Sequence, residues 1–80
     1  MVWKYDSGRG VNQDYAQAAY WYRRAANAGH ARAQSNLGEL YENGKGVQQD
    51  LNEAIRLYQL AARQGNDYAR KALNRLGRSW

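Results

Sequence analysis

The chain has 80 residues, a formal net charge of +5, no proline and no cysteine. It is long enough for one small domain, and without cysteine it has neither disulfide bridges nor thiolate metal sites. It contains no apolar run of about 18 residues that could span a membrane and no signal-peptide pattern at its start, whereas its positive charge leaves acidic proteins, nucleic acids and anionic membrane surfaces open as partners.

Two similar octets divide the sequence. SGRGVNQD occupies residues 7–14 and NGKGVQQD occupies residues 43–50, and a shift of 36 residues superposes Val11 on Val47. A fixed period of this size indicates stacked structural repeats. The alternative, a pair of phosphate-binding loops, would need a preceding strand and a Gly-Lys-Ser/Thr ending, and the sequence shows neither. We therefore interpret each octet as a connector between helices, with glycines at positive φ and the valine packed under the following helix.

Apolar residues recur at helical spacing between these connectors, as at Ala18, Tyr22 and Ala25. Gly29 and Gly65 are placed to end the first and third helices, because glycine adopts the left-handed conformation at low cost. In chain order, the expected elements are a stub over residues 1–6 and helices over residues 14–28, 31–43, 50–64 and 67–79.

The starts of two helices carry capping signals. Asp14 and Asp50 are expected to be N-caps, and Gln17 and Glu53, three residues later, would complete capping boxes. The same type of cap in both copies of the repeat predicts the same type of helix start.

Small and polar residues distinguish the second helix from the last one. Gly38 is expected to let the helix after it approach closely. The last helix has Asn74 at the corresponding position and Gly77 where the earlier helix has Tyr41. We interpret the last helix as a cap with a polar outer side, as the end of a repeat array requires.

At these residues the sequence resembles a known family. The run AQSNLGELYENGKGVQQDLNEAIRLYQLAARQG (33–65) resembles a complete Sel-one-like repeat, a relative of the tetratricopeptide repeats. The run YDSGRGVNQDYAQAAYWYRRAANAG (5–29) resembles the later two thirds of a preceding repeat, and residues 66–80 resemble the first helix of a third. The resemblance implies an all-α, right-handed α-solenoid of antiparallel helix pairs. It divides the single domain into a partial repeat (1–29), a complete repeat (30–65) and a capping helix (66–80).

The resemblance also implies a function. Members of this family mostly serve as scaffolds and adaptors, often in bacterial signalling, secretion or host contact, and share no catalytic residues. It therefore implies a protein–protein interaction module without enzymatic activity or cofactor, which binds a partner in the concave groove formed by the first helix of each pair. The residues expected to line this groove are Trp3, Asp6, Arg32, Ser35, Glu39, Glu42, Tyr68, Lys71, Arg75 and Arg78.

The basic part of this groove lies on the last helix. Its stripe consists of Tyr68, Lys71, Arg75 and Arg78. An acidic protein segment is the expected partner, because guanidinium groups pair with carboxylates. Binding of nucleic acid or another polyanion is the alternative, although Glu39 and Glu42 would repel phosphates. A repeat fragment, or an engineered minimal repeat with no partner of its own, is a further alternative.

The remaining candidates for chemistry have simpler interpretations. His30 is the only histidine, and it stands in a turn without a second histidine or a cysteine to complete a metal site. Glu39 and Glu42 lie on one helical face, where a solvated pair of carboxylates is expected. We therefore expect no catalytic residue and no metal ligand.

An aromatic edge near the start of the chain predicts self-association. Trp3, Trp21 and Tyr22 lie where the first repeat is incomplete, and exposed apolar patches usually mark interfaces. A two-fold dimer through this edge is expected, with a marginally stable monomer as the alternative.

Overall fold

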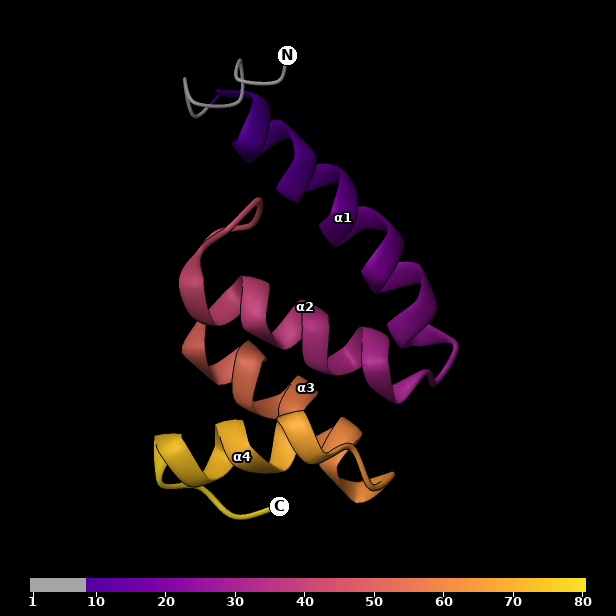
Figure 1. Ribbon diagram of the computed structural model, residues 1–80, viewed down its shortest axis with the longest axis vertical. Helices are drawn as coiled ribbons and strands as arrows, with labels where there is room; N and C mark the ends of the chain where they lie inside the picture. Colours follow the sequence, from indigo (N-terminus) through magenta and orange to yellow (C-terminus); the bar gives the residue numbers. More distant parts are fainter. Residues whose placement is uncertain (1–8) are drawn as a thin grey trace.

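The computed structural model describes the backbone of residues 9–80 and the side chains of residues 14–80. The helices follow one another from one end of the molecule to the other (Figure 1), as α1 (Arg9–Asn27), α2 (Ala31–Asn43), α3 (Leu51–Arg63) and α4 (Asp67–Leu76). Each helix packs against its neighbour in the chain. The all-α fold is confirmed, and the bounds of α2 agree with the predicted helix. The predicted stub, together with Trp3 and Asp6, lies outside the described residues.

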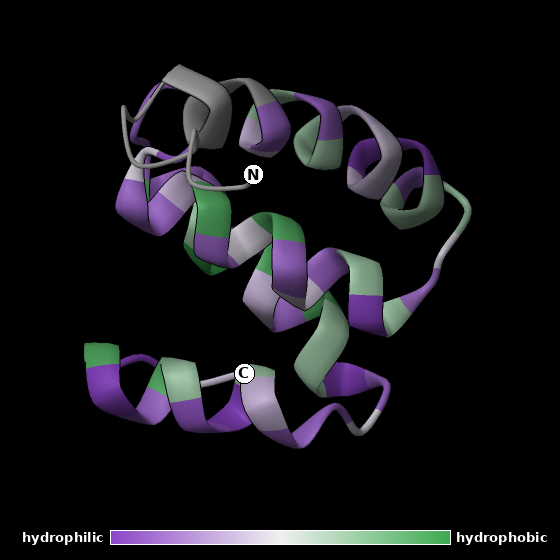
Figure 2. Ribbon diagram, turned by 45° about the horizontal axis from the view of Figure 1, so that its top comes forward, coloured by the Kyte–Doolittle hydropathy of each residue, from purple (hydrophilic) through white to green (hydrophobic). Residues whose placement is uncertain are grey.

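Small residues dominate the core, which allows the helices to pack closely. Most of the buried hydrophobic residues are alanines, and Leu37, Leu73 and Tyr58 supply the largest fully buried hydrophobic side chains. One cluster joins α1 and α2 to Leu57 of α3, and the other joins α3 to α4. Tyr41 packs against both clusters, so the two parts of the core are continuous. Hydrophilic residues cover much of α4 (Figure 2), as expected for a terminal helix.

A close helix contact lies at Gly38, where α2 meets α3. A Cβ atom on Gly38 would lie 3.1 Å from the Tyr58 ring and 3.2 Å from the backbone oxygen of Ala54. These distances are shorter than ordinary van der Waals contact. The predicted role of Gly38, to let the next helix approach closely, is therefore confirmed.

The second octet forms the predicted connector between α2 and α3. Gly44 (φ 68°) ends α2, and Gly46 (φ 74°) also takes the left-handed conformation. The backbone N–H of Asp50 donates a hydrogen bond to the carbonyl oxygen of Tyr41 at 2.9 Å, which closes the loop. Val47 packs against the core cluster of α1, α2 and Leu57 of α3, so it anchors the loop to the core, whereas its predicted position under the following helix stays a prediction.

The described part of the first octet, residues 9–14, is helical and does not form a connector. Because α1 begins at Arg9, Asp14 lies inside the helix, and its predicted capping box is wrong. The reason is tertiary. In the second octet, the backbone of α1 lies against Gly46, where a Cβ would come within 2.4 Å of the Tyr15 carbonyl carbon. This tertiary contact holds the second octet in its turn.

The caps of the later helices show how far local sequence decides the structure. Asp50 accepts a hydrogen bond from the backbone N–H of Glu53 at 3.1 Å, which confirms it as the N-cap of α3. The reciprocal half of the capping box is wrong, because the Glu53 carboxylate pairs with Arg56 instead. Asn66 caps α4 by accepting from the N–H of Ala69 at 2.8 Å, a role that the sequence analysis missed.

The last helix is shorter than the predicted 67–79. It ends at Leu76, because Gly77 (φ 74°) takes the left-handed conformation, and the N–H of Arg78 returns to the carbonyl of Leu73 at 2.8 Å. This pair of features satisfies the last carbonyls of a helix and turns the chain away from its axis.

The chain after α4 folds back along α3. Gln59 donates to the carbonyl of Ser79 at 3.0 Å, and Arg63 donates to the carbonyl of Trp80 at 3.3 Å. The Trp80 ring lies 4.2 Å from the guanidinium carbon of Arg70. Trp80 therefore lies outside α4, beside Arg70.

The two aspartates of the octets should differ in their effect on stability. Asp50→Ala should lower the free energy of unfolding by about 0.5–2 kcal/mol, because it removes the acceptor for the first turn of α3. Asp14→Ala, within α1, should change it by less than about 0.5 kcal/mol. Urea denaturation of both variants measures the difference, and equal losses would contradict the structure.

Gly46 and Gly29 provide a matched pair, because both have positive φ. Gly29→Ala should cost only the left-handed strain of about 1–2 kcal/mol, since nothing lies within 4 Å of its Cβ position. Gly46→Ala should cost more, because its Cβ would overlap the backbone of α1. Thermal melts followed by circular dichroism compare the two, and a smaller loss for Gly46→Ala would refute the contact.

Candidate partner-binding site

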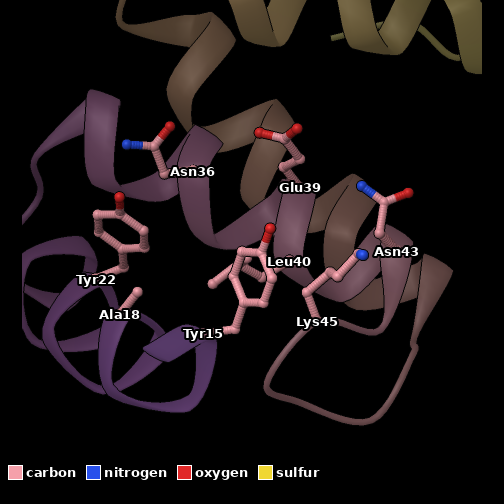
Figure 3. Close-up of a pocket in the computed structure, with 8 residues that line it drawn as sticks. All are labelled: Tyr15, Ala18, Tyr22, Asn36, Glu39, Leu40, Asn43 and Lys45. Carbon is pink, nitrogen blue, oxygen red and sulfur yellow. The ribbon is translucent and has the colours of Figure 1, made fainter. Parts of the chain in front are cut away.

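A cleft of about 220 Å³ opens between α1, α2 and the loop after α2. Figure 3 shows its walls, and the residues that line it are Tyr15, Ala18, Tyr22, Asn36, Glu39, Leu40, Asn43 and Lys45. The spacing of these residues explains the shape, because positions three, four and seven apart share one face of a helix. The cleft therefore presents two phenol rings on one side and amides with a carboxylate on the other.

Lys45 contributes the positive charge of the cleft. Its ammonium group lies 5.4 Å from the centre of the Tyr15 ring, a favourable cation–π distance. Tyr15 and Tyr22 also pack against the core cluster of α1 and α2, so these two walls are anchored. Glu39 was predicted from the sequence as a groove residue and Tyr22 as a residue of self-association, whereas Tyr15, Asn36 and Lys45 were not predicted as site residues.

A hydrogen-bonded ion pair joins α2 to α3 and α4 beside this cleft. The Tyr58 hydroxyl donates to Glu42 Oε1 at 2.8 Å, and Arg75 donates to both carboxylate oxygens at 2.5 and 3.1 Å. The Glu42 side chain is only 14% exposed. The prediction of two solvated carboxylates is therefore wrong for Glu42, although Glu39 is exposed.

The electrostatics of this group follow from its contacts. The hydrogen bond from Arg75 lowers the pKa of Glu42, because it stabilises the charged carboxylate. Burial raises the pKa of Tyr58, and the hydrogen bond to Glu42 raises it further. Burial and the charge of Glu39 raise the pKa of Tyr68, whose ring packs edge-on against Tyr58.

The structure separates the other residues predicted to line the groove. Ser35 is 2% exposed and hydrogen bonds to the carbonyl of Arg32, so its predicted position on an open surface is wrong. Arg75 is engaged by Glu42 rather than presented alone to a partner. Of the described groove residues, the exposed ones are Arg32, Glu39, Tyr68, Lys71, Arg75 and Arg78, and their contact with a partner stays a prediction.

The outer side of α1 carries an exposed aromatic group. Trp21 is 61% exposed and packs edge-on against Tyr20, with Arg24 over both rings. Tyr22, by contrast, is half-buried in the core cluster. Of the two described residues predicted to mediate self-association, Trp21 is the exposed one, and the dimer stays a prediction.

The described residues offer little for metal chemistry. His30 occupies the N-cap position of α2 without a capping hydrogen bond from its side chain. Among the described residues, no group of three or more metal-ligating side chains comes together. No helix in this part of the chain is long and apolar enough to cross a membrane.

Comparisons with known proteins identify the repeat. The sequence model of the Sel1 repeat matches residues 5–30 and 31–66. A crystal structure of c5321, a protective antigen of uropathogenic Escherichia coli with an SLR fold, is 46% identical over 88% of this chain, with a TM-score of 0.74. A crystal structure of a Sel1 repeat protein from Oxalobacter formigenes is 40% identical over 92%, with a TM-score of 0.77. No match to a curated protein was found.

These solved relatives are much longer than this chain. The chain covers 15% of the Escherichia coli antigen and 30% of the Oxalobacter protein. The match therefore concerns the repeats themselves, in agreement with the four helices described above.

The ion pair of Glu42 predicts a pH dependence. Because the pKa of Glu42 is lowered on folding, its contribution to stability is present above the ordinary value of about 4.3 and is lost as the pH falls through the lowered value. Glu42→Gln should therefore lose less stability than the native chain between about pH 6 and about pH 3. Urea denaturation across this range measures the slope.

Arg75→Gln is the matched variant, because it removes the largest cause of the lowered pKa. It should flatten the pH dependence in the same way, and the double variant should add little. A native slope in both single variants would exclude the ion pair as its source.

Proposed function

Because the chain belongs to the Sel1 repeat family, we propose that it is a protein-interaction module that binds a segment of a partner protein in the cleft between α1 and α2. The observation that carries this proposal is the composition of the cleft walls. Two anchored tyrosines face amide and charged side chains across an open volume of about 220 Å³, and aromatic anchors with satisfiable polar neighbours are typical of binding hot spots.

The cleft is favoured over the basic stripe of α4 as the binding site, because one cation of that stripe is already paired. Arg75 forms a bidentate contact with Glu42, although its side chain is 54% exposed, so Lys71 and Arg78 are the cations of the stripe that no ion pair of the described residues engages. A polyanion bound there would depend steeply on salt, because its affinity would come from counterion release. An acidic protein segment could still extend from the cleft onto this stripe.

A catalytic role has little support. The matched family is defined by a structural repeat, and the residues that line the cleft include no serine, cysteine or histidine that could act as a nucleophile–base pair. Binding rather than turnover is the chemistry that tyrosine, asparagine and paired charges provide here.

Site-specific photo-crosslinking tests the proposal. A photo-reactive phenylalanine analogue replaces Asn36 in the cleft or, as the control, Asn52, an exposed asparagine of α3. In extracts of the cells that produce the chain, the analogue at position 36 should form one discrete adduct with a partner protein, and the one at position 52 should not.

Glu39→Arg, at an exposed position, should reduce the yield of this adduct without changing the melting temperature. Equal adducts at both positions, or none at position 36, would contradict the cleft as the binding site.

A further inference from the structure

The 36-residue period relates the cleft to a second site in the molecule, the filled place, which is formed by residues of α3 and α4 and occupied by α2. The shift carries Ala18 and Tyr22 of the cleft onto Ala54 and Tyr58 of α3, and it carries Glu39 onto Arg75 of α4. The first two pairs keep the same residue, whereas the third exchanges a carboxylate for a guanidinium. The filled place therefore shows what kind of element fits the cleft. The exchange of Arg75 for Glu39 shows that the cleft requires the opposite charge on that element.

Helix α2 fills the second place through two residues that are four positions apart. Gly38 lies against the Tyr58 ring and the backbone of Ala54, where a Cβ would be 3.1–3.2 Å from its neighbours. Glu42, one turn later, accepts hydrogen bonds from Tyr58 and Arg75. The place thus selects a helix with a small residue for close approach and an acidic residue to match the cation of α4.

From this relation we infer that the cleft binds a helix of a partner protein that carries a glycine or alanine and, four residues later, a lysine or arginine. The small residue packs against Tyr22 and Ala18. The basic residue pairs with Glu39, which stands where Arg75 stands in the filled place, so the charge preference is reversed. This inference rests on the proposed function and names the chemistry of its partner.

The polar residues of the cleft agree with a partner that is not a buried core element. Asn36 and Asn43 occupy the positions of Ala72 and Ser79 in the filled place. Ala72 is buried, whereas amide side chains remain compatible with water when the partner is absent. The ammonium group of Lys45 lies over the Tyr15 ring, two helical turns from Tyr22 along α1. Glu39, and not Lys45, therefore supplies the charge at the position that corresponds to Arg75.

Two other occupants fit less well. In the 36-residue register, the chain's own first residues would bring Asp6 against Glu39, two like charges. A second copy that docked the end of its α4 would offer Arg78 to Glu39, but Asn74 would replace the small residue, and Gly77 ends the helix before Arg78. A partner helix with both features satisfies shape and charge together.

Helical peptides test the inference directly. The probe is a fluorescent peptide of residues 31–43 with Glu42→Arg, held helical by a lactam bridge on the side away from Gly38, and the control is the same peptide with native Glu42. Fluorescence anisotropy with the full chain should show that the arginine peptide binds tighter by about threefold or more, the size of a partly exposed ion pair. A Gly38→Leu change in the probe should abolish binding, because it blocks close approach to Tyr22.

The matched change in the protein is Glu39→Arg. Because this position is exposed, the variant should fold normally, and its melting temperature checks this. This variant should reverse the preference and bind the glutamate peptide tighter. No binding by either peptide, or binding without charge preference in both proteins, overturns the inference. In the latter case, a crosslink at Asn36 would still support the proposed function, whereas a missing crosslink would remove the function itself.

Two further measurements identify the occupant of the cleft if it is not a partner helix. An affinity for the probe that rises tenfold in Tyr5→Ala would show competition by the chain's own first residues. Sedimentation of the chain alone that reveals assemblies dissolved by Glu39→Arg would show that a second copy occupies the cleft. Either result overturns a partner helix as the occupant, and unchanged affinity with a monomeric chain supports it.

Discussion

The close approach of α2 to α3 at Gly38 is the constraint from which the other interactions follow. It places the Tyr58 ring fully inside the core, and a buried phenol needs a hydrogen-bond partner. Glu42 supplies the acceptor, and because a half-buried carboxylate is costly without a counter-charge, Arg75 from α4 completes the group. One residue without a side chain therefore leads to an ion pair between α2 and α4 and a hydrogen bond from α3.

The helices were predictable where local signals and the repeat agreed. The bounds of α2, the cap at Asp50 and the close contact at Gly38 followed from spacing, capping chemistry and residue size. The cap at Asp14 failed although its octet resembles that of Asp50. A glycine-rich octet permits a turn, but in the second copy the turn is held by contact between Gly46 and α1. Such a contact is set by the neighbouring repeat and is not written in the octet.

The binding surface was harder to predict than the fold. A stripe argument treats each helix alone, so it placed Ser35, Glu42 and Arg75 on one open face. In the structure, Ser35 is buried and the other two residues pair with each other across helices. The cleft is assembled from α1, α2 and the loop, and its members share a face only after the helices pack. The sequence signal that could have pointed to the cleft is the 36-residue register, because it aligns Glu39 with Arg75.

The packing of Gly46 on α1 links the stability of adjacent repeats. The loop between α2 and α3 takes its shape from a helix of the preceding repeat, and Leu57 of α3 belongs to the core cluster of α1 and α2. The cooperative unit therefore crosses the boundaries of the sequence repeat. In the nearest-neighbour description of repeat proteins, stability is the sum of the intrinsic energy of each repeat and the interface energy between neighbours, and these contacts contribute to the interface energy. Fraying of α1 would accordingly loosen the packing of α3 as well.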